Sequence, residues 1–153
     1  CDGAEVALNA GLDAEAAQGR LAQLHAPFHA ACAAAAAAAP PRAVLSVHSF
    51  TDCYEGSRRD VELGVLVNRE DELGARLTAR LRAAGYDART NEPWSAKDGL
   101  MYCAERHAEP HQSHAVMLEV RQDLFAEPGF TGRLADQLRD ALAAPELLPF
   151  FAV

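Results

Sequence analysis

Two stretches of this sequence end an apolar, β-branched run with side chains that can do chemistry. Side chains alternate along a strand, so the predicted strand over 113–121 places Glu119 and Arg121 on one face and Val120 on the other. A carboxylate and a guanidinium are costly to bury there without a partner or a task. A second predicted strand, 43–49, presents His48 near its end. Open α/β sheets place their sites at strand ends, so we expect these three side chains to meet in one crevice.

Each of these side chains also has a structural interpretation. From the residue type alone, His48 is better explained as a hydrogen-bonded histidine at a strand end. Glu119 and Arg121 would equally form an internal ion pair. His25 and His29 are four residues apart, a spacing at which a metal pair is conceivable, but Pro27 lies between them. The sequence contains no His-Glu-x-x-His motif of the zincin type, no glycine-rich phosphate loop and no Gly-x-Ser-x-Gly elbow.

The composition bounds the class of protein. The 153 residues are half hydrophobic and 24% charged, which predicts a globular domain with a real core. A formal net charge of −8 argues against nucleic acid and anionic membranes as partners. The alanine run 33–39 is too short to span a bilayer. The four cysteines lack paired spacing, which favours reduced thiols and a cytoplasmic location.

Hydrophobic periodicity predicts strands alternating with helices. Helices are expected over 13–39, 68–85, 98–108 and 131–144, and strands over 43–49, 61–67, 86–90 and 113–121. Pro27 should kink or split the first helix, and Asn68 should cap the second. Residues 51–60 are expected to form a loop, and the apolar tail 145–153 to pack back on the domain. The fold class is therefore α/β, with a mixed, largely parallel sheet flanked by helices in a single domain over 1–153.

Several segments, taken in order, carry a resemblance to a known family. They are Ser46-Val47-His48-Ser49-Phe50-Thr51, Gly64-Val65-Leu66, Asn91-Glu92-Pro93-Trp94-Ser95, Asp98-Gly99, Tyr102, Arg106-His107-Ala108 and Leu118-Glu119-Val120-Arg121-Gln122-Asp123-Leu124, preceded by Asp2-Gly3, Asn9-Ala10-Gly11-Leu12 and Ala26-Pro27-Phe28-His29-Ala30. This order resembles the N-formylglutamate amidohydrolase family over nearly the whole chain. Phe28 and Trp94 stand where that family usually has tyrosine, and Cys103 where threonine is common.

The resemblance implies a zinc-carboxypeptidase-like (phosphorylase/hydrolase-like) fold and a Zn²⁺ cofactor. It implies that His48 is the third zinc ligand and that the first two ligands lie upstream of Cys1, so an N-terminally truncated domain is expected. A catalytic zinc takes three protein ligands and a water, and His48 by itself would hold the ion weakly.

The resemblance also implies roles for other residues. Glu119 would be the general base, and Arg121 would bind a substrate carboxylate or steady the oxyanion. Secondary substrate contacts are expected from Asn91, Ser95 and Arg106, with His107 orienting a site residue.

The function implied is hydrolysis of a small N-acyl amino acid, with N-formyl-L-glutamate giving formate and L-glutamate. One alternative is a non-catalytic remnant that keeps the fold without a complete metal site. Another is a related zinc amidase acting on other N-acyl amino acids or peptides. A missing segment should supply further strands, so we also expect an exposed sheet edge and self-association through it.

Overall fold

The computed structural model describes residues 9–151, and the chain divides into two compact units at Pro40. The described part of the first unit is helical: α1 (Ala14–Arg20), a π-helical turn over Leu21–His25, and α2 (Ala26–Ala38). Asp13 begins α1, because its carboxylate accepts a hydrogen bond from the backbone N–H of Ala16 at 2.7 Å. Pro27 has no N–H to donate, and the expected interruption takes the form of the π-helical turn just before it.

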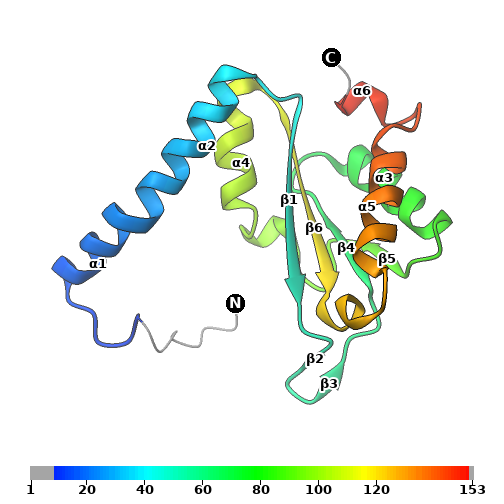
Figure 1. The fold of residues 1–153 in the computed structure, drawn as a ribbon, viewed down its shortest axis with the longest axis horizontal. Helices are drawn as coiled ribbons and strands as arrows, with labels where there is room; N and C mark the ends of the chain where they lie inside the picture. Colours follow the sequence, from blue (N-terminus) through cyan, green and yellow to red (C-terminus); the bar gives the residue numbers. More distant parts are fainter. Residues whose placement is uncertain (1–8, 152–153) are drawn as a thin grey trace. The chain divides into compact units, whose positions relative to one another are not determined.

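The second unit is built on a four-stranded sheet (Figure 1). Its strands are β1 (Ala43–Phe50), β4 (Leu63–Leu66), β5 (Ala88–Thr90) and β6 (His114–Arg121), in the order β1-β6-β4-β5. β1 pairs with β6, and β4 with β5, in parallel, whereas β6 and β4 are antiparallel. This arrangement confirms the predicted α/β class with a mixed, largely parallel sheet.

Helices cover both faces of the sheet (Figure 1). On one face, α3 (Asp71–Ala83) and α5 (Phe130–Leu142) bury the larger cluster, which includes Leu77, Val116 and Leu118. On the other face, α4 (Tyr102–Ala108) packs on a smaller cluster around Leu66 and Met117. Short 3-10 turns lie over Ala96–Asp98, Glu109–His111 and Gln122–Ala126. Because side chains alternate along β6, its odd-numbered residues Glu119 and Arg121 face the α4 side.

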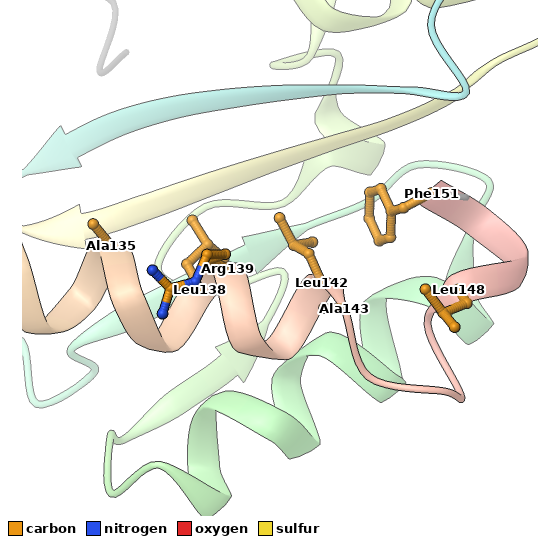
Figure 2. Close-up of a pocket in the computed structure, with 7 residues that line it drawn as sticks. All are labelled: Ala135, Leu138, Arg139, Leu142, Ala143, Leu148 and Phe151. Carbon is orange, nitrogen blue, oxygen red and sulfur yellow. The ribbon is translucent and has the colours of Figure 1, made fainter. Parts of the chain in front are cut away.

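The tail returns to the domain as expected. Leu147 is fully buried, and α6 (Leu148–Phe151) adds Phe150 and Phe151 to the larger cluster. Figure 2 shows the apolar groove between α5 and α6. It is lined by Ala135, Leu138, Arg139, Leu142, Ala143, Leu148 and Phe151. No helix within residues 9–151 has the length and apolar character needed to cross a membrane. No disulfide joins Cys32, Cys53 or Cys103 in the described part of the chain.

Two sequence-based expectations are wrong. The segment 51–60 is not a plain loop, because β2 (Cys53–Tyr54) and β3 (Ser57–Arg58) form an antiparallel hairpin there. Its two-residue turn, Glu55-Gly56, has positive φ at both residues, as tight hairpin turns require. Asn68 does not cap α3, which begins after Glu70 without a side-chain cap. The Asn68 amide instead donates to the Glu105 carboxylate at 2.8 Å.

Candidate functional site

One row of the sheet brings two predicted site residues together. In the strand register His48 lies opposite Glu119, Glu119 opposite Gly64, and Gly64 opposite Arg89. Residues opposite one another in a sheet share a face, so His48 and Glu119 lie side by side on the α4 face. Of the three side chains expected to meet in one crevice, His48 and Glu119 therefore occupy facing positions on neighbouring strands.

Glu119 has a buried carboxylate oxygen on this face of the sheet. The residue is 7% exposed, and its Oε2 is buried with no hydrogen-bond partner among the described residues. Burial raises the pKa of the Glu119 carboxyl above its ordinary value, while the charges of His48 and Arg59 act in the opposite direction. A buried acceptor without a partner destabilises the fold, so its presence favours a functional task.

Gly64 lets the 91–95 loop pack close to the sheet beside Glu119. A Cβ placed on Gly64 would lie 2.1 Å from the carbonyl oxygen of Glu92 and 3.2 Å from the Cβ of Glu119. Only a residue without a side chain lets the 91–95 loop approach the sheet this closely. The loop therefore covers the row next to the carboxylate.

His48 is exposed, and its Nε2 lies 2.9 Å from the Ser46 hydroxyl on the same face of β1. An exposed imidazole at a strand end can bind a metal through either ring nitrogen. Within residues 41–151, however, no set of three His, Cys, Asp or Glu donor atoms gathers at one point. This unit offers His48 as a single ligand next to a buried carboxylate.

Arg121 has an internal role in the structure. Its Nε donates to Asp123 Oδ1 at 2.7 Å, and its Nη1 donates to the Asp60 carbonyl at 2.6 Å and more weakly to the carbonyls of Arg59 and Val61. Its Nη2 lies 3.9 Å from Glu62 Oε1. All three nitrogens thus face groups of the protein, and no ion pair joins Arg121 to Glu119 in the described chain. These contacts favour a structural role for Arg121 over the predicted binding of a substrate carboxylate.

Asn91 and Ser95 shape the loop over the row. Asn91 has a left-handed backbone, and its amide accepts from the N–H groups of Val67 and Ala96 and donates to the Val67 carbonyl. The Ser95 hydroxyl accepts from the N–H of Lys97 and begins the following 3-10 turn. Their predicted contacts with a substrate stay predictions, because their known contacts are to the backbone.

Arg106 and His107 lie on a different element, α4. Arg106 is exposed and donates to the hydroxyl of Tyr102, with its guanidinium 5.6 Å from that ring. His107 is in the last turn of the helix. The substrate contacts predicted for both residues remain predictions.

Sequence reasoning missed Arg59. The residue follows the β2–β3 hairpin, and its guanidinium carbon lies 4.5 Å from the Trp94 ring centroid and 4.7 Å from that of Tyr54. Its Nη1 donates to the carbonyl and hydroxyl of Thr51 at 3.2 and 3.3 Å. Arg59 lies in a polar stretch of the sequence without periodicity. The Glu55-Gly56 pair, where Gly56 favours a tight turn, was the signal that could have placed Arg59 just after a hairpin.

Two solved structures share this fold. A gene product from Agrobacterium tumefaciens has 33% sequence identity and a TM-score of 0.74, over 88% of this chain and 57% of that protein. The N-formylglutamate amidohydrolase from Ralstonia eutropha JMP134 has 19% identity and a TM-score of 0.60, over 83% of this chain and 52% of that enzyme. The chain therefore spans just over half the length of each. A search of curated proteins gives no match.

The fold and the site define an α/β protein with a histidine and a buried glutamate on adjacent strands. The model of the N-formylglutamate amidohydrolase family matches residues 1–126. The chain belongs to this family, as its sequence motifs predicted.

Proposed function

We propose that this chain carries part of the catalytic centre of a metal-dependent amidohydrolase. The substrate class is a small N-acyl amino acid, with N-formyl-L-glutamate as the first candidate and formate and L-glutamate as its products. The family assignment supports the reaction class. The observation that carries the proposal is the buried, unpartnered Oε2 of Glu119 opposite His48.

Glu119 acts as the proton carrier in this proposal. Water attack on an amide needs a base to take a proton from the water and an acid to give one to the leaving nitrogen. A carboxyl whose pKa is raised by burial can do both, because its pKa is nearer the working pH. A positioned general acid–base contributes about 10²–10⁴ to the rate.

His48 fits a metal ligand in part. It lies on the strand next to the proposed base, and its imidazole is exposed. A catalytic zinc needs three protein ligands, so we propose that the remaining ligands come from outside residues 41–151. Zinc, when bound, supplies a Lewis acid that polarises the acyl carbonyl. Ser46, within hydrogen-bond distance of His48, orients the imidazole.

The test is formate release from N-formyl-L-glutamate in the presence of zinc, compared with N-acetyl-L-glutamate and N-formyl-L-alanine. His48→Asn should lower both the zinc content and the activity. His111→Asn, in the 3-10 turn that precedes β6, is the matched control and should retain both. A folded protein that holds zinc stoichiometrically yet hydrolyses none of the three compounds would contradict the proposal and favour the non-catalytic alternative. Activity confined to N-acetyl-L-glutamate would favour the related zinc amidase.

A further inference from the structure

We propose that Arg59, rather than Arg121, is the guanidinium that binds a carboxylate of the substrate. The inference rests on the proposed function for its substrate class, but the contacts that carry it are independent of that function. It names the residue that selects an anionic N-acyl amino acid over a neutral one.

Aromatic rings hold the guanidinium of Arg59. Its central carbon lies 4.5 Å from the Trp94 centroid, 4.7 Å from that of Tyr54 and 5.8 Å from that of Phe50. The Tyr54 and Trp94 rings contact each other edge to face, with centroids 5.9 Å apart. Three aromatic faces fix the guanidinium plane without neutralising its charge. We call Phe50, Tyr54 and Trp94 the aromatic shelf.

The donor edge of Arg59 is available. Its Nη1 donates to Thr51, but within residues 9–151 neither Nε nor Nη2 has a hydrogen-bond acceptor. No carboxylate of the described chain lies within ion-pair distance of Arg59, whereas Arg121 is paired with Asp123 and Arg89 with Asp87. A half-buried arginine stacked on aromatic rings, with two parallel N–H donors left over, has the geometry that binds a carboxylate bidentately.

Arg59 lies where it can serve the proposed base. It is close enough to Glu119 for its charge to lower the pKa of that carboxyl, against the effect of burial. The backbone places it there, because its N–H donates to the Asp52 carbonyl at 2.8 Å and its own carbonyl accepts from Arg121 at 3.3 Å. Arg121 thus acts as the positioning residue, and Arg59 makes the contact with substrate.

The test measures binding by calorimetry on the full 153-residue chain with zinc present. The probes are N-formyl-L-glutamate, N-formyl-L-glutamine, which lacks the side-chain carboxylate, and N-formyl-L-glutamate α-amide, which lacks the other. Arg59→Gln should weaken binding of N-formyl-L-glutamate about ten- to a hundredfold, the range expected for hydrogen bonds to a charged group. Arg59→Lys should recover only part of this loss, because lysine keeps the charge without the planar fork.

The matched control is Arg58→Gln. It makes the same charge change at the neighbouring residue, whose side chain is 66% exposed and lies 3.8 Å from Asp123. It should leave binding within about twofold of wild type, because exposed ion pairs contribute little. Trp94→Leu should weaken binding while keeping the charge, since it removes one face of the aromatic shelf. The probe on which Arg59→Gln has no further effect identifies the carboxylate that Arg59 binds.

Equal weakening by Arg59→Gln and Arg58→Gln would overturn the inference, because only long-range charge would then be at work. A folded wild-type chain that binds none of the probes would also overturn it. Formate release with an unchanged KM in Arg59→Gln would overturn the inference and leave the proposed function standing. Binding that depends on Arg59 without formate release would uphold the inference and contradict the proposed function.

Discussion

Arg121 provides a test of whether the strand-end arginine has a structural or a substrate-binding role. The substitution Arg121→Met keeps an unbranched side chain along the strand and removes the guanidinium. The Arg121 side chain is 9% exposed, and its partner Asp123 is 34% exposed. The change therefore removes hydrogen bonds to Asp123 and to the Asp60 carbonyl and leaves Asp123 with Arg58, 3.8 Å away, as its remaining cation.

The expected loss follows from these contacts. Breaking a buried ion pair costs about 3–5 kcal/mol. Water can reach one third of Asp123, so we reduce the expected loss to about 2–4 kcal/mol for this partly exposed pair. A domain of this size has a free energy of unfolding of about 5–15 kcal/mol, so the loss is a large share of it.

The assay is urea unfolding followed by circular dichroism, with Arg139→Met on α5 as the control. The Arg139 side chain is 68% exposed and pairs with Asp136 and Asp140, so its removal should change the free energy of unfolding by less than about 0.5 kcal/mol. Arg121 also lowers the pKa of Asp123 in the folded state. The stability that this shift contributes is present above the unfolded pKa of Asp123 and is lost as pH falls through the folded pKa. The difference in free energy of unfolding between wild type and Arg121→Met should therefore become smaller at acidic pH. An Arg121→Met protein as stable as Arg139→Met, but unable to bind substrate, would refute this reasoning and restore the sequence-based interpretation.

Three further predictions concern Gly64, Glu119 and the β1 edge. Gly64→Ala should destabilise the domain by at least about 1–3 kcal/mol, because its Cβ would meet the Glu92 carbonyl. Gly132→Ala on α5, whose Cβ would meet nothing, should stabilise the domain by about 0.5–1 kcal/mol. Equal shifts in melting temperature for the two variants would contradict this. Burial raises the folded pKa of Glu119, so wild type loses stability as pH rises through that pKa. Glu119→Gln should therefore be at least as stable as wild type at pH 8, and the difference in stability should vanish below about pH 4. Melting curves that show a less stable variant at pH 8 would indicate a structural role for Glu119. β1 is an edge strand of the described sheet, and its Val47 is 57% exposed. We propose that the protein self-associates through this edge at high concentration and that Val47→Lys reduces the association. Sedimentation that shows a monomer at every concentration would rule this out.

The sequence predicted the elements that position the site. The expected strands over 43–49 and 113–121 agree with β1 and β6 to within one residue, because their apolar alternation is long and regular. Alternation also predicted the face shared by Glu119 and Arg121. It could not predict their partners, because the carbonyls that accept from Arg121 belong to a loop about sixty residues away in sequence.

The failures have the same physical origin. Asn68 has the residue type of a helix cap, but its side-chain amide donates a hydrogen bond to Glu105, 37 residues later. Arg59 lies in a polar stretch without periodicity, and one ring of its aromatic shelf, Trp94, comes from a different loop. Local pattern predicts an element and its faces, whereas such contacts depend on the tertiary fold.

The central claim is that Glu119 carries the proton in amide hydrolysis, and the most direct measurement is the kcat of Glu119→Gln for formate release from N-formyl-L-glutamate. Glutamine keeps the size of the side chain but cannot accept the proton. The account predicts a fall in kcat of about 10²–10⁴, with zinc content, KM and melting temperature close to those of wild type. A folded, zinc-loaded Glu119→Gln protein with near-normal kcat would contradict the account.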